Sequence, residues 1–345
     1  MFSKNLKYYR LKNNMTKREL ASLVQVTPMA ITNYESGARR PDMAIIQSLA
    51  DALGVRVTDF LVRRNETLQF VHGEFRKSSK LTKGQQQFVR EAVEEYVGRF
   101  YSIIHILGDH VLPDGPMVGQ LIMTGDPEVD AKAMRKYLKI AETGPVGNLV
   151  ELLENRGVIV YVCSQCIDDF YGMNGTVNSR PYIAVSANQS PERMRSTIAH
   201  ELAHLMFSWD GVDAEAAEEM ATAISGAFLF PAEDVVRELG VRRTQISKDM
   251  AFTCKEYGIS MYLLVKRASI CKVISQSIAK DFYIRAGKLG WRKSEPSRIQ
   301  RESPTLFAQL VYRAVSEEEI SVQRGAELLC QTYDHVLEQS GGEDI

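Results

Sequence analysis

The sequence predicts an α+β protein that is mostly helical and contains more than one domain. The chain has 345 residues, more than one ordinary hydrophobic core contains. Apolar residues recur at helical spacing over most of its length. Two short apolar runs, residues 158–162 and 182–185, interrupt that pattern and flank a segment rich in turn-forming residues. We therefore expect a small sheet within a largely helical fold.

The same patterns divide the chain into regions. One long amphipathic helix is expected around residues 88–100, and another helical pattern runs from Asp130 to about Asn155. The segment between the two strands contains the pair Asn174 and Gly175, which favours a hairpin-like connection. The expected regions are a compact helical domain (1–65), a helical linker (66–115), a domain with the sheet (116–245) and a helical C-terminal region (246–345).

Composition and cysteine usage narrow the class of protein. Hydrophobic residues make up 45% and charged residues 25%, which fits a globular chain rather than a disordered or fibrous one. The N-terminal residues lack the apolar core of a signal peptide, and no apolar run approaches the length of a membrane span. A cytoplasmic location without a membrane partner is expected. Five cysteines, an odd number, favour reduced thiols over a disulfide framework.

The near-zero net charge of -1 conceals an uneven distribution. Residues 1–64 contain eleven Lys or Arg against five Asp or Glu, whereas the rest of the chain contains 31 against 38. Because the first domain is basic and the rest of the chain is acidic, we expect only the first domain to bind a polyanion.

Capping signals define two short helices in the basic domain. Thr16 precedes Glu19 at capping-box spacing, and Thr27 precedes Pro28, a residue well tolerated at the first position of a helix. Gly37 ends the second helix. Two helices of about residues 17–25 and 28–36, joined by a tight turn, describe a helix-turn-helix motif whose second helix can enter the DNA major groove.

The run MTKRELASLVQVTPMAITNYESGARRPDMAIIQSLADALGVRVTDFL resembles the Xre/Cro, lambda-repressor-like family of helix-turn-helix regulators. The resemblance implies a five-helix domain that binds a double-stranded DNA operator, as a homodimer where half-sites are paired. It also implies a base contact from Asn33. The groove-facing residues would be Thr27, Pro28, Met29, Thr32 and Asn33, and the phosphate contacts Lys17, Arg39 and Arg40. The alternative is a helical bundle whose basic face serves protein interaction.

The segment ERMRSTIAHELAHLMFSWDG contains the pattern HExxH at His200, Glu201 and His204. On a helix, positions i and i+4 share a face, so both imidazoles can bind one zinc ion with Glu201 beside it. A third ligand is needed from downstream. The following helical segment offers Glu218, which shares a face with small residues, and the alternatives Glu215 and Glu219.

The stretch from Tyr182 through Pro231 resembles the ImmA/IrrE family of metallopeptidases, with similarity over residues 70–245. The resemblance implies a zincin-like domain with Zn²⁺ as cofactor, in which the acidic residue of Glu-x-x-Ala-Asn is Glu218. Thr222 stands here where that pattern has asparagine. The implied reaction is hydrolysis of a peptide bond in a repressor-type protein, this chain included, under a stress or phage-related signal. Glu201 would be the general base. Tyr171 and Tyr182 are candidates for a second oxyanion donor.

Two other interpretations remain open from the sequence. The protein could be a non-enzymatic transcription factor or an antitoxin-like repressor, whose second domain senses a ligand, metal or partner. The pair Cys163 and Cys166 could be half of a zinc site or a redox pair. The sequence disfavours the cysteine site, because it contains no second CxxC and the pair does not open a helix after its strand.

Overall fold

The computed structural model describes residues 2–61, 68–73, 81–164, 169–291, 295–296 and 298–341. The chain divides into two compact units. The first contains the N-terminal helices and the long helix α5 as far as Ile103. The second contains strand β1 and, from Ile104 onward, the sheet and the remaining helices. The described residues include no helix long and apolar enough to cross a membrane.

The N-terminal domain is built from four α-helices and a closing 3-10 helix. These are α1 (Phe2–Lys12), α2 (Lys17–Leu23), α3 (Pro28–Ser36), α4 (Met43–Leu53) and η1 (Val57–Leu61). They enclose one hydrophobic core, and its fully buried members include Leu6, Leu20, Ile31, Leu49 and Phe60. The expected five-helix architecture is therefore present, with the fifth helix in 3-10 form.

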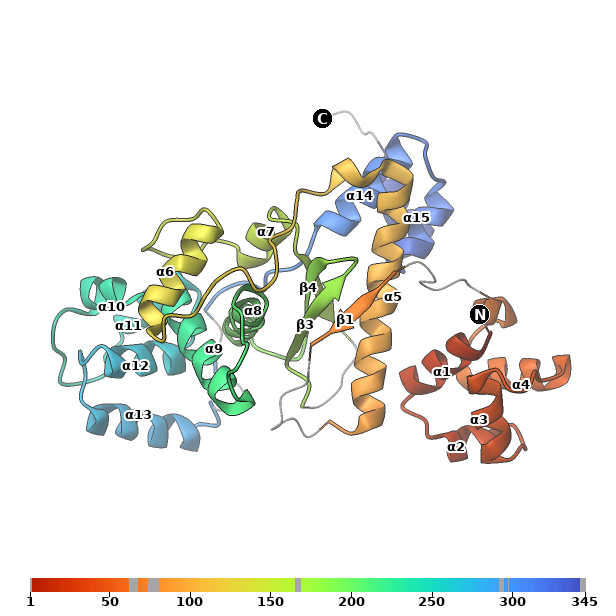
Figure 1. Cartoon of the computed structure of the whole chain (residues 1–345), viewed down its shortest axis with the longest axis horizontal. Helices are drawn as coiled ribbons and strands as arrows, with labels where there is room; N and C mark the ends of the chain where they lie inside the picture. Colours follow the sequence, from red (N-terminus) through yellow and green to blue (C-terminus); the bar gives the residue numbers. More distant parts are fainter. Residues whose placement is uncertain are drawn as a thin grey trace. The chain divides into compact units, whose positions relative to one another are not determined.

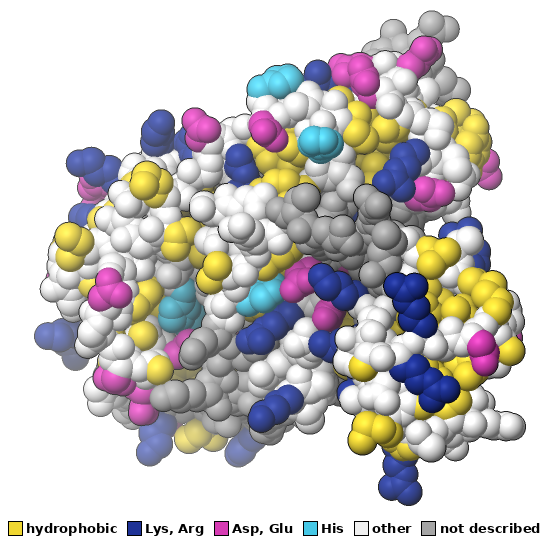
Figure 2. Space-filling view, turned by 45° about the vertical axis from the view of Figure 1, so that its right-hand side comes forward, with side chains coloured by type: hydrophobic (Ala, Val, Ile, Leu, Met, Phe, Trp, Pro, Cys, Tyr) yellow, Lys and Arg dark blue, Asp and Glu magenta, His cyan; other side chains and the backbone are white. Residues whose placement is uncertain are grey.

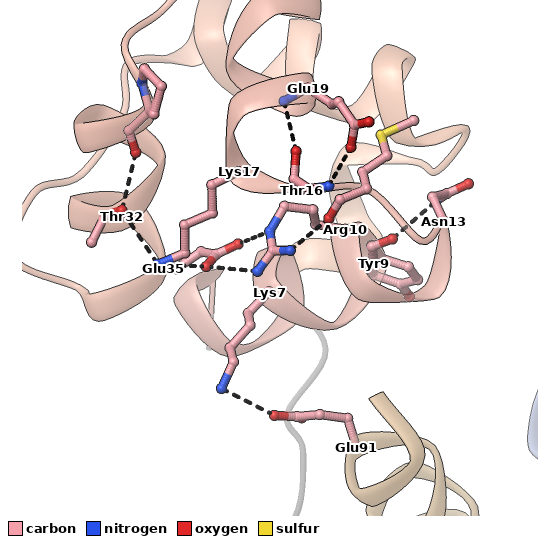
Figure 3. A network of polar contacts seen from close by, with 12 residues as sticks. Lys7, Tyr9, Arg10, Asn13, Thr16, Lys17, Glu19, Thr32, Glu35 and Glu91 are labelled. Atoms are coloured by element: carbon pink, nitrogen blue, oxygen red, sulfur yellow. Dashed lines mark hydrogen bonds and ion pairs between the residues drawn. The ribbon is translucent and has the colours of Figure 1, made fainter. Parts of the chain in front are cut away.

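Side-chain caps set the ends of α2 and α3, as the sequence predicts. The hydroxyl of Thr16 accepts a hydrogen bond from the Glu19 backbone N–H at 3.2 Å, and the Glu19 carboxylate accepts one from the Thr16 N–H at 2.6 Å (Figure 3). The hydrogen bond from the Thr16 backbone N–H, followed by the Thr16 side chain, lowers the pKa of the Glu19 carboxyl. Gly37, at φ 77°, ends α3 in the left-handed conformation.

The segment expected as a helical linker (66–115) contains a strand as well as helices, which corrects that prediction. Strand β1 (Phe70–His72) precedes α5 (Lys83–Leu107) and the short 3-10 helix η2 (Asp109–Val111). Three residues are too few for a period-2 pattern to identify, so the strand depends on its pairing partner. The long amphipathic helix is present, as predicted.

A four-stranded sheet lies at the centre of the second unit, in the order β1-β3-β4-β2. Its other strands are β2 (Ile159–Cys163), β3 (Gly172–Val177) and β4 (Arg180–Ser186). Strands β3 and β4 form an antiparallel hairpin, and β2 runs parallel to β4. Asn178 and Ser179, at φ 46° and 65°, form the hairpin turn. The Asn174–Gly175 pair therefore lies inside β3 and not at the turn.

Helices cover this sheet and form the main core of the unit. They are α6 (Pro127–Tyr137), α7 (Leu149–Glu154), α8 (Pro191–Met206), α9 (Ala214–Leu229), α10 (Ala232–Leu239), α11 (Met250–Tyr257), α12 (Met261–Ile270) and α13 (Gln276–Lys288). Helix α8 packs against β3 and β4, and α9 packs against α8 (Figure 1). The predicted helical pattern from Asp130 to Asn155 is two helices separated by a loop.

The predicted domain boundary at residue 245 does not coincide with a break in packing. The buried core cluster continues from Ala131 through Ala286, so α11, α12 and α13 share the core of the sheet domain. The last three helices, α14 (Leu306–Ser316), α15 (Val322–Leu329) and α16 (Tyr333–Ser340), pack on one another. Helical periodicity alone does not tell which core a helix joins.

Two carboxylates, the buried Glu154 and the half-buried Glu302, connect the segment before α14 to the sheet domain. The Glu302 carboxylate accepts hydrogen bonds from the N–H groups of Leu149 and Val150 and forms an ion pair with Arg195 of α8. The Glu154 carboxylate accepts from the N–H of Thr305 at 3.0 Å. Burial raises the pKa of Glu154, and hydrogen bonds from the start of α14 oppose that rise. Of these contacts, the Glu302–Arg195 ion pair holds the first half of α8, the helix whose second half carries the HExxH residues.

Candidate metal centre

Helix α8 presents two histidines one helical turn apart. Ser190 caps its start by accepting a hydrogen bond from the Arg193 N–H, and Pro191 takes the first helical position. His200 is 3% exposed and His204 is half-buried. Their Nε2 atoms lie 3.1 Å apart. The spacing of four residues thus places both imidazoles on one face, as the sequence predicts for this motif.

Helix α9 brings a carboxylate to the same point. The Glu218 oxygens lie 3.4 Å from Nε2 of His200 and 3.2 Å from Nε2 of His204. Ligand atoms placed about 2.0–2.1 Å from a tetrahedral zinc ion are about 3.3 Å apart, so this spacing fits one ion. Among the described residues, these three form a cluster that could hold a metal. Glu215 and Glu219 of the same helix are exposed and do not belong to it.

Thr222 and Trp209 contact the two histidines from outside the cluster. The hydroxyl oxygen of Thr222 lies 3.3 Å from Nδ1 of His200. When Nε2 supplies its lone pair to a metal, Nδ1 carries the proton and donates to that oxygen. The Trp209 Nε1–H donates to the backbone carbonyl of His204 at 3.0 Å, and the two rings pack with centroids 5.1 Å apart. Thr222, which stands where the family pattern has asparagine, therefore contacts His200 on the side away from Glu218.

Glu201 lies beside the histidines and contacts strand β3. Its carboxylate is 5% exposed, and Oε2 accepts a hydrogen bond from Nδ2 of Asn174 at 2.7 Å. A Cβ atom at Gly172 would lie 3.2 Å from Cγ of Glu201 and 2.6 Å from Cγ2 of Thr197, so the absent side chain leaves room for the carboxylate. The sequence does not point to either β3 residue, because the Asn174–Gly175 pair has the composition of a turn.

The two candidate oxyanion donors make other contacts. Tyr182 is fully buried in β4, with its hydroxyl 2.6 Å from Nδ1 of His72. The Tyr171 ring stacks under the Arg193 guanidinium, whose Cζ lies 4.5 Å from the ring centroid. Cys163 is buried at the end of β2, and Cys166 lies outside the described residues.

The predicted DNA-contacting residues lie on and beside α3. Thr27, Pro28 and Met29 are exposed at its start, and Thr32 and Asn33 follow half-buried one turn later. Nζ of Lys17 lies 3.3 Å from Oγ1 of Thr32 and 3.6 Å from a carboxylate oxygen of Glu35 (Figure 3). The predicted phosphate contact is thus held here by partners on α3.

Basic side chains and a buried ion pair complete the description of this domain. Arg39 and Arg40, just after α3, are exposed, and Figure 2 shows Lys and Arg side chains in dark blue over the molecular surface. The buried Arg10–Glu35 ion pair, with Nε and Oε1 2.5 Å apart, links α1 to α3. It fixes the orientation of α3 within the domain.

Comparison with known proteins is consistent with both sites. A helix-turn-helix family model matches residues 6–60, and the model described as the IrrE N-terminal-like domain, of the M78 peptidases, matches residues 164–269. An uncharacterized HTH-type transcriptional regulator of Bacillus subtilis (strain 168), YqaE, is 31% identical over 77 residues, or 22% of this chain and 66% of that protein. No solved structure matches. The chain therefore combines an Xre-type helix-turn-helix domain with an IrrE/ImmA-like domain of the M78 peptidase family.

Proposed function

We propose that the protein is a DNA-binding transcriptional regulator whose second domain is a zinc-dependent peptidase. Its substrate is a peptide bond in a repressor-type regulatory protein, either a separate protein or a copy of this chain. The convergence of His200, His204 and Glu218 within bonding distance of one ion, with Glu201 next to them, is the observation that carries the proposal. A helix-turn-helix domain in the same chain favours a regulatory protein as substrate.

The residues of this chain have separate tasks in the proposed reaction. A zinc ion held by His200, His204 and Glu218 would supply Lewis-acid activation of the attacking water and of the scissile carbonyl. Glu201 accepts a proton from the attacking water and passes it to the leaving amine. Asn174 positions Glu201 by donating a hydrogen bond to one carboxylate oxygen, and Thr222 accepts from Nδ1 of His200 so that Nε2 faces the ion.

The test separates metal binding from cleavage. The wild type and Glu201→Gln are purified with zinc and incubated with repressor-type proteins encoded beside the gene, with and without a chelator. We expect equal zinc content and equal DNA binding in the two proteins. Cleavage should occur only in the wild type without chelator. A zinc-loaded wild type that leaves these proteins and itself intact contradicts the peptidase assignment and favours a sensing role for the domain.

DNA recognition is proposed through α3. Its exposed start, with Met29 66% exposed, can enter the major groove, while Arg39 and Arg40 reach phosphates. Asn33→Ala should change the sequence preference with little change in salt dependence, whereas Arg39→Ala should weaken binding to all sequences and reduce the salt slope by about one. Fluorescence anisotropy with DNA from upstream of the gene, over a salt series, measures both.

A further inference from the structure

The last three helices contain a motif that the function proposed above does not use. α14, α15 and α16 pack on one another as a small bundle (Figure 1). The Ser321 hydroxyl caps α15, Cys330 turns the chain in the left-handed conformation at φ 54°, and the Thr332 hydroxyl caps α16. A Cβ at Gly325 of α15 would lie between 3.0 and 3.3 Å from valines of α14 and α16, so the three helices are closely packed. Two short helices joined by a tight turn and supported by a third make a helix-turn-helix.

This C-terminal motif repeats the geometry of α2 and α3 in the N-terminal domain. There Thr16 and Thr27 are the caps, and the turn residue Gln25 also has φ 54°. In both motifs the turn residue lies nine positions after the first cap, and the second cap lies two positions later. The residue after the turn donates its N–H to an alanine carbonyl of the first helix, at 2.9 Å in the N-terminal motif and 3.0 Å in the C-terminal one. Corresponding positions are also buried in both, namely Ala21 and Ile31 in the first motif and Ala326 and Val336 in the second.

The second helix of the C-terminal motif has an acidic and apolar surface. The positions that correspond to the groove-facing positions of α3 are exposed in α16, and we call them the α16 face: Tyr333, Asp334, Leu337 and Glu338. Residues 306–340 carry two Arg against six Asp or Glu, a charge that DNA phosphates repel. Tyr333 is 48% exposed and Leu337 46%, and exposed apolar side chains of this kind favour contact with a protein. The α16 face therefore has the composition of a protein-docking surface.

The N-terminal domain offers a surface of complementary charge. Residues 1–64 contain eleven Lys or Arg against five Asp or Glu. Met29 of α3 is 66% exposed, and Arg39 and Arg40 are exposed just after that helix; we call these three residues the α3 face. Both faces combine exposed apolar side chains with two charges, and the charges are of opposite sign. Every copy of the chain supplies both faces, so a second copy is a partner of the required chemistry.

We infer that the α16 face of one copy docks on the α3 face of a second copy. The inference rests on the proposed recognition of DNA through α3, because the docked face is the one that would enter the major groove. Two copies that exchange these contacts reciprocally form a closed dimer. In that dimer both DNA-reading helices are covered, so self-association and DNA binding exclude each other.

Sedimentation velocity of the full-length chain, over a concentration series in low and high salt, tests the contact. Glu338→Lys reverses a charge of the α16 face, and a lysine in the last turn of α16 suits the helix dipole, so the bundle should stay folded. Glu256→Lys is the matched control, because it makes the same charge change at an exposed position of α11. Arg40→Glu reverses a charge of the α3 face. Leu337→Ala removes an apolar contact of the α16 face without any change of charge, and circular dichroism checks that all variants are folded.

The wild type and Glu256→Lys should form dimers of equal affinity that dissociate in high salt. Glu338→Lys and Arg40→Glu should each weaken the dimer about tenfold, because each places like charges opposite one another, and Leu337→Ala should weaken it as well. A chain that is monomeric at every concentration, or a dimer that Glu338→Lys and Leu337→Ala leave unchanged, overturns the inference. A dimer that responds to these two variants but not to Arg40→Glu also overturns it, because the α16 face would then dock on another surface.

DNA binding separates failure of this inference from failure of the proposed function. At a protein concentration at which the wild type is dimeric, DNA from upstream of the gene should dissociate the dimer, and Glu338→Lys should bind that DNA about tenfold more tightly than Glu256→Lys. A dimer that responds to both charge reversals in a chain that binds no DNA supports the docking and contradicts DNA recognition through α3. Equal DNA affinities of Glu338→Lys and Glu256→Lys support DNA recognition and overturn the docking. A monomeric chain in which Glu338→Lys binds DNA more tightly places the contact within one copy and overturns the role of a second copy.

Discussion

The Thr222 hydroxyl should contribute measurably to zinc affinity. Thr222→Val removes the oxygen that lies 3.3 Å from Nδ1 of His200 and keeps the shape of the side chain. A neutral hydrogen bond contributes about 0.5–1.5 kcal/mol, equivalent to a factor of about 2 to 13 in affinity. Loss of a partner behind a metal ligand typically weakens binding about 10- to 100-fold. Because this contact is long and Thr222 is exposed, we expect zinc affinity to fall by about 3- to 15-fold, close to the lower end of the range for such partners.

Competition for zinc with a chromophoric chelator of known affinity measures this change. Thr222→Ser is the matched control, because it keeps a hydroxyl at the same carbon and should bind zinc within about twofold of the wild type. A Thr222→Val protein with wild-type zinc affinity would show that the hydroxyl does not orient His200. A Thr222→Ser protein that binds zinc as weakly as Thr222→Val would show that the shape of the side chain, and not the hydrogen bond, determines the zinc affinity.

Three further predictions follow from contacts elsewhere. Gly172→Ala introduces a Cβ 2.6 Å from a threonine of α8, and should destabilise the second unit by about 1–3 kcal/mol in urea denaturation and slow cleavage. Glu302→Gln leaves buried Arg195 without its charge partner and should lower the free energy of unfolding of the second unit by about 3–5 kcal/mol. Tryptophan fluorescence during urea denaturation measures this change, because both tryptophans lie in this unit. An unchanged unfolding midpoint contradicts the prediction. The pKa of Glu19 is lowered by Thr16, so the interaction stabilises the N-terminal domain above the unfolded pKa near 4.5, and this contribution is lost as pH falls through the folded value. Thr16→Val keeps the backbone N–H, the larger cause, and removes the side-chain hydroxyl, so the NMR-measured pKa of Glu19 should rise only part of the way to its usual value. An unchanged titration would show that the Thr16 hydroxyl does not contribute to the lowered pKa.

The elements that the sequence predicts well are those specified by local signals. Helices α2 and α3 are defined by caps within four residues of their starts, at Thr16 and Thr27. The pairing of His200 with His204 follows from helical geometry once the segment is known to be a helix. The prediction of Glu218 depended on the face of a second helix and on a family pattern, because the packing of α9 on α8 is not a local property.

The features that the sequence does not predict depend on pairing across the chain. Strand β1 is too short to carry a periodic pattern and exists through its partner β3, about 100 residues later. Asn174 and Gly175 have the composition of a turn, yet both lie within β3, and the turn falls at Asn178 and Ser179. The positioning contact from Asn174 to Glu201 could not be found without that register.

The central claim is that His200, His204 and Glu218 together hold one zinc ion. Its most direct test is the zinc content per chain after dialysis against a limiting chelator, for wild type, Glu218→Ala and the neighbouring exposed control Glu215→Ala. We expect one zinc ion per chain in the wild type and in Glu215→Ala, and a strongly reduced content in Glu218→Ala. A Glu218→Ala protein that retains zinc like the wild type, or a wild type that binds none, contradicts the account.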